Sequence, residues 1–326
     1  MKKAKKFTFI DLFAGIGGFH LALHELGGKC VFVNDFDKHA RKTYEYNFKK
    51  KNPKLFKNKF REEYFWKSIK DLTLTNTNTS ESVWVNNIRN VIPEFDVLCA
   101  GFPCQPFSQA GKQLGFSDDR GTLFGDIERI ILARQPKIVF LENVRNILTH
   151  DNGKTFQIIL KKLEDAGYYV NPDRDDSWNI FRASEFGLPT NRPRFYLVGF
   201  RKDMPNLGQF KFPQPTTPER MTLRNFFNNS QWPDIVGRTI RVGGRGSPVY
   251  KKTNGEWFVD RRSWDTYIVG GSKHVLTIDE AKKMMGFPKN FIFPESVTPT
   301  QAFKQLGNSV AINVIRAIGK EIIKFL

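Results

Sequence analysis

The sequence FIDLFAGIGG (residues 9–18) has the pattern of a strand that turns through glycines into a helix. Glycines allow a tight turn and a close approach of the backbone to a ligand. A second β-rich run ends in Asn34-Asp35, about twenty residues further on, where a carboxylate can bind the hydroxyls of a ribose. The pairing predicts a site for an adenosine-containing cofactor at one edge of a parallel sheet.

The spacing of the glycines disfavours NAD as that cofactor. Dinucleotide-binding loops follow G-x-G-x-x-G, whereas here the glycines stand at 15, 17 and 18. An ordinary tight turn between a strand and a helix is the alternative, and the placement of Asp35 argues against it.

Outward from this stretch, short β-rich runs alternate with segments of helical period. This alternation predicts an α/β fold, with a doubly wound, mostly parallel sheet. The predicted strands are residues 7–13, 30–34, 95–100, 137–141 and 195–200, and the predicted helices are 18–26, 38–47, 122–134 and 154–166. Near the end of the chain, Ile315, Ile318, Ile322 and Phe325 fall on one face and predict a closing helix.

Two segments interrupt the alternation. Residues 49–82 are first basic and then polar, and we predict a surface insertion there. Residues 201–273 are rich in Gly, Pro, Arg and Trp without a helical period, which predicts a second, smaller and irregular domain. The predicted organisation is a catalytic and cofactor-binding domain (1–200), the irregular domain (201–273) and a return segment (274–326).

Charge and cysteine content restrict the class of protein. The 326 residues carry a formal net charge of +18, which predicts a polyanionic partner, with nucleic acid favoured over a membrane surface. No run approaches the roughly 18 apolar residues that a membrane helix needs. Three cysteines cannot form an even disulfide framework and no Cys/His cluster has zinc spacing, so we expect a cytoplasmic protein without a metal site.

A thiol and a carboxyl group stand at equivalent places in two predicted strands. The apolar run 95–101 leads into Pro103-Cys104-Gln105-Pro106, and the run 137–141 leads into Glu142. The carboxyl ends of parallel strands meet at the edge where open α/β sheets carry their chemistry. We therefore expect Cys104 and Glu142 to face one pocket.

Cys104 differs from the other two cysteines in its surroundings. Cys30 and Cys99 lie in apolar runs and are predicted to pack in the core, whereas Cys104 opens a polar, glycine-containing loop and is a candidate nucleophile. Glu142 has two interpretations, a strand-end carboxylate in a salt bridge or a carboxyl group whose neutral form donates to a ring nitrogen. Arg192 and Arg194 precede the strand 195–200 on one face and could supply positive charge.

Taken together, these segments resemble the C5-cytosine DNA methyltransferases of bacterial restriction-modification systems. The resemblance covers nearly the whole chain and keeps the order of the family's motifs. The motifs are DLFAGIGG (11–18), NDF (34–36), GFPCQPFS (101–108), LENV (141–144), the arginine pair and GNSV (307–310). Three departures are Thr190 in place of the usual glutamine before the arginines, a displaced third motif at 70–72, and Asp279-Glu280 in place of an arginine.

The resemblance implies S-adenosyl-L-methionine as the cofactor. Its pocket would be formed by the glycine turn, the acid and aromatic residue of the second motif, the third motif, the helix after the catalytic loop and the last motif. By this comparison the residues are Phe13, Ala14, Gly15, Ile16, Gly17, Gly18, Asp35, Phe36, Asp71, Leu123, Asn308 and Ser309.

The resemblance also implies the catalytic and DNA-binding residues. Cys104 would add to C6 of a cytosine flipped out of the duplex, Glu142 would contact N3 and N4, and Arg194, the second of the pair with Arg192, would reach O2. DNA contacts are predicted at Ser108 and Gln109, in a loop (108–116) expected to be mobile, and at Arg241 and Arg245 of the irregular domain.

The predicted partner is duplex DNA, bound by a monomer and shared with a separately encoded restriction endonuclease. Three alternatives remain at this point: an RNA cytosine-5 methyltransferase of the same fold, an NAD-dependent oxidoreductase, and a DNA-binding module without catalysis. By the resemblance, residues 201–273 take the position of the family's target-recognition domain. Their size and basic character favour duplex DNA over RNA.

Overall fold

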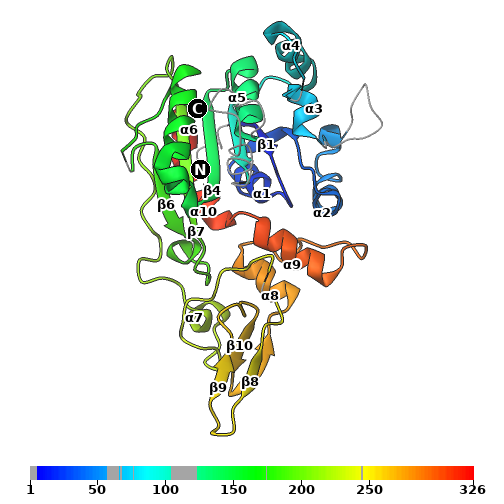
Figure 1. The fold of residues 1–326 in the computed structure, drawn as a ribbon, viewed down its shortest axis with the longest axis vertical. Coiled ribbons are helices and arrows are strands. Elements are labelled where there is room, and N and C mark those ends of the chain that lie inside the picture. Colours follow the sequence, from blue (N-terminus) through cyan, green and yellow to red (C-terminus); the bar gives the residue numbers. More distant parts are fainter. Residues whose placement is uncertain are drawn as a thin grey trace.

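The structure is a computed structural model, and it describes residues 6–56, 66, 68–75, 77–103, 123–173, 175–243 and 245–326. An upper lobe holds the large sheet, and a tapering lower lobe holds two small hairpins (Figure 1). Helices α8 and α9 lie between the lobes (Figure 1). In the described part of the chain, no helix has the length and apolar character needed to cross a membrane.

The large sheet has the strand order β2-β1-β3-β4-β7-β5, with β6 paired to β7. Strands β2, β1, β3 and β4 are mutually parallel, as predicted, whereas β7 runs antiparallel to β4 and also pairs antiparallel with β5 and β6. The short link from β6 into β7 accounts for the antiparallel β6–β7 pair, because parallel neighbours need a longer crossover connection. The bounds are Phe7–Leu12 (β1), Gly28–Val33 (β2), Val97–Gly101 (β3), Ile138–Val144 (β4), Tyr168–Tyr169 (β5), Trp178–Arg182 (β6) and Pro193–Arg201 (β7).

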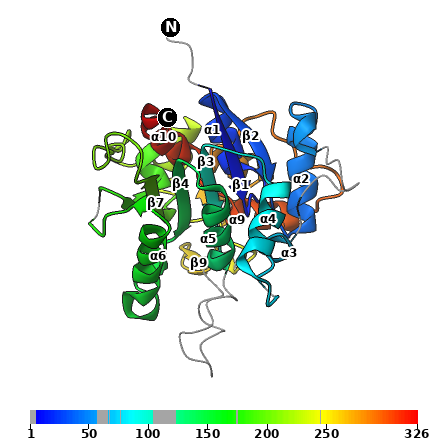
Figure 2. The ribbon, with the colours of Figure 1, turned by 90° about the horizontal axis from the view of Figure 1, so that it is seen from above.

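Helices cover both faces of this sheet, with α1 and α10 on one side and α5 and α6 on the other (Figure 2). Alternate residues of β1 point to opposite faces of the sheet, since Phe9 packs in one hydrophobic cluster and Ile10 in the other. The predicted helices are present, together with α3 and α4. Their bounds are Gly18–Glu25 (α1), Lys38–Phe48 (α2), Ile69–Thr73 (α3), Glu81–Val91 (α4), Leu123–Arg134 (α5), Lys154–Asp165 (α6) and Ile312–Ile322 (α10).

The cysteines and the closing helix follow the prediction. Cys30 and Cys99 are buried, and burial raises the pKa of both thiols. In α10, Ile315, Ile318 and Ile322 are buried against the core. These three residues therefore form the apolar face that closes the layer beside α1.

The segment 49–82 is a correction to the prediction of a surface insertion. Phe56, in the short helix η1 (Pro53–Phe56), and Ile69 and Leu72, in α3, are buried in the hydrophobic core. Helix α4, which was not predicted, adds Trp84 and Ile88 to the same layer. Its apolar residues are spaced one helical turn apart, but polar residues surround them and weaken the pattern.

In its described residues, the lower lobe has a short helix and two hairpins, within the range 201–273 for which an irregular domain was predicted. Its first residues do not pack separately, since Phe210 contacts Phe200 of β7 and Phe212 contacts Phe181 of β6. The elements are α7 (Leu223–Phe227), β8 (Val249–Lys251), β9 (Trp257–Val259), β10 (Thr266–Val269) and β11 (Ser272–Val275). The chain returns through α8 (Ile278–Met284) and α9 (Pro299–Asn308).

The glycine turn yields a test of stability at Gly17. Its φ is +85°, and an added Cβ would lie 2.5 Å from the ring of Phe48. A left-handed alanine costs about 1–2 kcal/mol, and overpacking adds about 1–3 kcal/mol. We expect Gly17→Ala to lower the free energy of unfolding, measured with denaturant, by both contributions.

Gly167→Ala is the matched control, because Gly167 has φ +91° with nothing within 4 Å of an added Cβ. This variant should lose only the backbone contribution of about 1–2 kcal/mol. Equal losses in the two variants would contradict the packing role of Gly17.

Candidate active site

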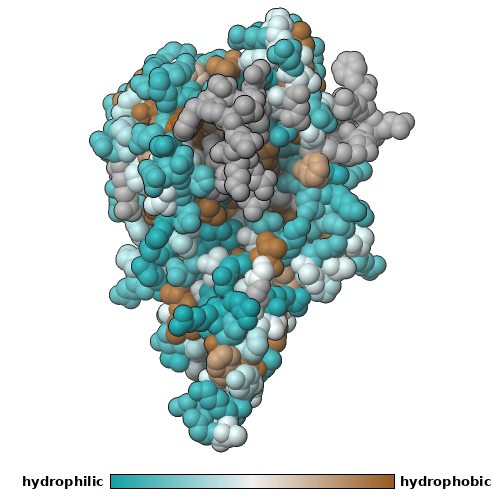
Figure 3. Space-filling view, viewed as in Figure 1, coloured by the Kyte–Doolittle hydropathy of each residue, from teal (hydrophilic) through white to brown (hydrophobic). Residues whose placement is uncertain are grey.

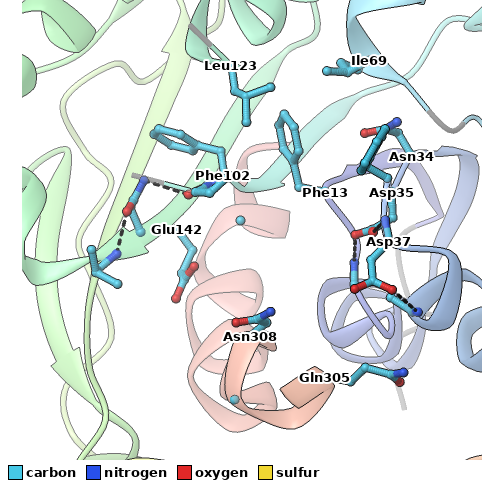
Figure 4. Close-up of a pocket in the computed structure, with 18 of the residues that line it drawn as sticks. Phe13, Asn34, Asp35, Asp37, Ile69, Phe102, Leu123, Glu142, Gln305 and Asn308 are labelled. Atoms are coloured by element: carbon cyan, nitrogen blue, oxygen red, sulfur yellow. Dashed lines mark hydrogen bonds between the residues drawn. The ribbon is translucent and has the colours of Figure 1, made fainter. Parts of the chain in front are cut away.

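A cavity of about 880 Å³ lies where the parallel strands end. Its wall is built from the residues that follow β1, β2 and β3, from the end of β4, and from α9 (Figure 4). One end of the cavity is lined by the glycine turn and the residues after β2, and the other by β4 and the start of β7.

At the first end, Asp35 fixes the glycine turn. Gly15 donates its backbone N–H to Oδ2 of Asp35 at 2.7 Å, and Asp37 donates its own to Oδ1 at 2.7 Å. The turn itself uses left-handed backbone at Phe13 (φ 54°) and Gly15 (φ 56°). One carboxylate therefore joins the end of β2 to the loop after β1.

Burial raises the pKa of Asp35 to about 6, although the hydrogen bonds from Asp37 and Gly15 oppose that change. The group is therefore ionised at neutral pH and becomes neutral in mild acid. Asp37 has a different role, since its side chain caps the N-terminus of α2 by accepting from His39 and Ala40.

Apolar side chains stand beside this carboxylate. Phe13, Ile69 and Leu123 line the cavity together (Figure 4). Phe36 also lines it, although 81% of its surface is exposed, a large value for a phenylalanine. A planar apolar group could be held here, which agrees with the adenosine predicted from the sequence.

At the other end, Glu142 is buried on β4, and its Oε1 lies 3.1 Å from Nε of Arg194. Burial raises the pKa of Glu142, while the charges of Arg194 and Arg192 act against that rise. Gly101, at the end of β3, lies beside this carboxyl group, since an added Cβ would be 3.4 Å from Oε2 of Glu142.

Asn143 holds the chain that leads toward the predicted nucleophile. Its Nδ2 donates to the carbonyl of Phe102 at 2.9 Å (Figure 4). Pro103, the last described residue before Cys104, lines the cavity. Cys104, Ser108 and Gln109 lie outside the described residues.

Arg192 connects three segments through its guanidinium group. It donates to the carbonyls of Ile240 (3.3 Å), Gly307 (2.9 Å) and Ser309. Burial lowers the pKa of Arg192 to about 9, so it remains a cation at neutral pH. It lines the cavity and also ties the strand β7 to the lower lobe and to the end of α9.

The structure places nine of the twenty predicted site residues in the wall of this cavity. Lining it are Phe13, Gly15, Asp35, Phe36, Leu123, Glu142, Arg192, Arg194 and Asn308. Other predicted cofactor residues support the turn from behind: Ile16 is in the core, Gly17 leaves room for Phe48 and Gly18 leaves room for Val310. Ala14 donates its N–H to Asn34, and Ser309 accepts from Arg192.

Asp71 requires a correction. It is exposed in the first turn of α3 and does not line the cavity, whereas Ser68, Ile69 and Lys70 do. The cavity is thus lined by Ser68, Ile69 and Lys70 and not by Asp71, and Ser68 caps the N-terminus of α3. Sequence reasoning also missed Phe102, Lys304 and Gln305, which line the cavity. Phe102 could have been found from its place in GFPC, beside the predicted nucleophile.

Two arginines of the lower lobe were predicted to contact DNA. Arg245 lies 4.3 Å over the ring of Phe303 in α9, with its Nε 3.6 Å from Asp265. Arg241 donates to the carbonyl of Arg262 at 3.5 Å. Both arginines are thus at the junction between the lower lobe and α9, and the surface of the lower lobe is mostly hydrophilic on the face in view (Figure 3).

Similarity to solved structures supports the fold. The chain aligns with the Dnmt2 methyltransferase of S. pombe at a TM-score of 0.62 and 17% identity, over 98% of this chain and 99% of that one. It aligns with the methyltransferase EhMeth of Entamoeba histolytica at a TM-score of 0.57 and 19% identity, over 98% of both chains.

Sequence comparison identifies the family. The Type II methyltransferase M.HpaII of Haemophilus parainfluenzae is 38% identical, over 99% of this chain and 90% of the relative. M.HhaI of Haemophilus parahaemolyticus is 33% identical, over 98% of this chain and 95% of the relative. The family model of the C-5 cytosine-specific DNA methylases matches residues 7–240 and 231–324. The chain therefore belongs to the C-5 cytosine-specific DNA methylase family.

Proposed function

We propose that this protein transfers a methyl group from S-adenosyl-L-methionine to C5 of a cytosine that is flipped out of duplex DNA. The observation that carries the proposal is that one cavity has the Asp35 carboxylate at one end and the Glu142–Arg194 pair at the other. Two substrates bound at those ends would meet in the same space.

The residues of the first end fit the cofactor. Asp35 offers an ionised carboxylate, Gly15 exposes backbone in the turn, and Phe13, Phe36 and Ile69 offer apolar surfaces for adenine. When bound, S-adenosylmethionine would supply an electrophilic methyl group. The chain's own task is to hold that donor beside the base and to exclude water from it.

Cytosine C5 is a weak nucleophile, and Cys104 is proposed to activate it. The thiolate adds to C6, and the electron pair of the C5–C6 bond makes C5 nucleophilic. C5 would then take the methyl group as its bond to the donor sulfur breaks, with S-adenosylhomocysteine as the leaving group. The proton on C5 leaves to a base and the C6–sulfur bond breaks, which restores the ring and the thiolate. The motif GFPCQPFS and the position of Pro103 in the cavity wall support this assignment.

Glu142 and Arg194 are proposed to stabilise the ring during that addition. Burial favours the protonated form of Glu142, which can donate to N3 as negative charge develops there. Arg194, held 3.1 Å from the same carboxyl group, is proposed to donate to cytosine O2. Arg192 donates both terminal nitrogens of its guanidinium group to backbone carbonyls, so we assign it a positioning role.

The proposed partner is duplex DNA bound between the two lobes. A target base must leave the stack before its C6 can be reached, at a cost of about a few kcal/mol. The family model describes DNA methylases, which does not favour the RNA alternative. We also propose that the protein acts as a monomer in the cytoplasm, beside a separately encoded restriction endonuclease.

Replacing Cys104 by serine tests the nucleophile. An alcohol is a far weaker nucleophile than a thiolate, so we expect methyl transfer to fall by at least about 10³-fold. Transfer of labelled methyl groups to plasmid DNA measures the loss, and a gel-shift assay should show DNA binding retained. Turnover at the normal rate would refute the scheme.

Asp35 should make cofactor binding depend on pH. Its charged form accepts hydrogen bonds from ribose hydroxyls, so the affinity for S-adenosylhomocysteine should fall below pH about 6, by up to tenfold per pH unit. Calorimetric titrations from pH 5 to 8 measure this, and Asp35→Asn should remove the dependence.

The stability of the free protein should move in the opposite direction. Between pH about 4 and 6 the folded state keeps the proton of Asp35, while the unfolded chain, with a pKa of 3.8, has released it. The free energy of unfolding should therefore decrease from pH 4 to 6 by this contribution and level off above. If Asp35→Asn keeps the pH dependence of both the affinity and the free energy of unfolding, another group is responsible for them.

Arg245 tests base recognition by the lower lobe. Phe303 and Asp265 hold its guanidinium group, and an oriented fork suits a guanine edge. Arg245→Ala should reduce discrimination at one base pair by about 1–3 kcal/mol. Bisulfite sequencing of plasmid from expressing cells measures this discrimination as the methylation of sites that differ at one base pair. Arg262→Ala is the control, because that side chain is 72% exposed and pairs within its own turn, whereas the guanidinium group of Arg245 also lies over Phe303. Unchanged site preference in Arg245→Ala would rule out base reading.

A further inference from the structure

The described residues of the loop 241–246 lie where the lower lobe meets the wall of the cavity. The carbonyl of Ile240, just before the loop, accepts a hydrogen bond at 3.3 Å from Arg192, which lines the cavity. An added Cβ on Gly307, another lining residue, would lie 3.0 Å from the carbonyl carbon of Arg241. The loop therefore starts at the edge of the cavity.

This loop is exposed and rich in glycine. Arg241, Val242, Gly243, Arg245 and Gly246 are all exposed. Among the described residues, an added Cβ on Gly243 or on Gly246 would meet nothing within 4 Å. Glycine gives the backbone wide conformational freedom, so a defined loop conformation requires contacts from outside the loop.

Two consecutive buried residues, Trp264 and Asp265, supply such contacts from the chain just before β10. The indole N–H of Trp264 donates to the carbonyl of Gly243 at 2.8 Å. Oδ2 of Asp265 accepts from the backbone N–H of Gly246 at 3.2 Å and lies 3.6 Å from Nε of Arg245. Trp264 is fully buried and Asp265 is 1% exposed. Buried side chains thus hold an exposed loop at two points.

Helix α9 supports the same contacts from below. The ring of Phe303 packs edge-on against the ring of Trp264, with 5.7 Å between the centroids. The guanidinium group of Arg245 lies 4.3 Å from the centroid of the same phenylalanine ring. The loop, the buried pair and α9 therefore form one packed unit beside the cavity.

An ordered loop would favour specific over non-specific DNA binding. Non-specific binding rests on phosphate contacts, which require no particular loop conformation. Reading a base edge requires groups at fixed positions, and a loop ordered in advance avoids a loss of conformational entropy on binding. Contacts that order the loop should therefore raise the affinity for one sequence and leave the affinity for other sequences nearly unchanged.

We propose that Trp264 and Asp265 are positioning residues for DNA sequence specificity, which hold the loop 241–246 in the conformation that reads bases at the edge of the cavity. This inference rests on the proposed function, in which Arg245 reads a base. Trp264 orders the backbone at Gly243, and Asp265 orders Gly246 and the side chain of Arg245. Both residues act through the loop without touching the DNA.

Replacing Trp264 by phenylalanine tests this role in the full-length protein. The change removes the indole donor but keeps an aromatic ring against Phe303. One duplex contains the sequence that bisulfite sequencing shows to be methylated, and a second duplex of equal length lacks it. In gel-shift titrations the Kd of the first should rise about 3- to 10-fold, the factor for one neutral hydrogen bond, and the Kd of the second should stay constant.

The kinetics of methyl transfer separate positioning from catalysis. In Trp264→Phe the loss should appear in the KM for the methylated sequence and not in kcat, because the bound cognate duplex restores the ordered loop. A loss confined to kcat would overturn the proposal.

Replacing Asp265 by asparagine is a second test that hardly changes the side-chain volume. It keeps an oxygen for the N–H of Gly246 but removes the charge that faces Arg245. The Kd of the cognate duplex should rise in Asp265→Asn, and this rise should disappear in the Arg245→Ala background, where no guanidinium group remains to be oriented. An equal rise in both backgrounds would contradict the role of Asp265.

Trp178→Phe is the matched control. Trp178, on β6 in the upper lobe, also donates its indole N–H to a backbone carbonyl, that of Pro172, at 2.7 Å. This variant should leave the ratio of the two Kd values unchanged. An equal change of the ratio in both tryptophan variants, or no change in Trp264→Phe, would overturn the inference. A wild-type protein that methylates no cytosine would instead refute the proposed function, and this inference with it.

Discussion

The parallel alignment of β2, β1, β3 and β4 is the constraint on which the site depends. Parallel strands end at the same edge of a sheet, and residues at or just after the end of each of these four strands line the cavity. The glycine turn follows β1, Asp35 follows β2, Pro103 follows β3 and Glu142 lies in the last part of β4. Residues spread over more than one hundred positions of the chain thus share one space.

Within that space, the two ends differ in how charge is stabilised. Asp35 is buried but accepts two backbone hydrogen bonds, so the carboxylate remains ionised at neutral pH. Glu142 is buried beside two arginines, where desolvation favours the protonated form and the cations favour the charged form. These opposed influences suit a group that must accept and release a proton during a reaction, whereas Asp35 suits a group that binds without reacting.

Helix α9 links the Asp35 end of the cavity to the lower lobe. The ring of its Phe303 lies under Arg245, and its Gln305 accepts a hydrogen bond from Thr43 of α2. The carbonyl of its Gly307 accepts from Arg192. Gly307 also packs closely on the backbone of Arg241, since an added Cβ would lie 3.0 Å from it. A change in the position of the lower lobe would therefore act on the same helix that lines the cavity.

The sequence alone determined the glycine turn, Asp35, Glu142, the arginine pair and the closing helix, because local patterns carry them: glycines at a turn, apolar runs that end in a functional group, and a helical stripe. Only the tertiary structure placed Gln305 beside Thr43, 262 positions away, and Arg192 on the carbonyls of the last motif. It alone revealed that Ile69 and not Asp71 faces the cavity, that α4 joins the core, and that β7 runs antiparallel. Contacts between distant segments depend on how whole elements pack, and a linear pattern does not contain that information.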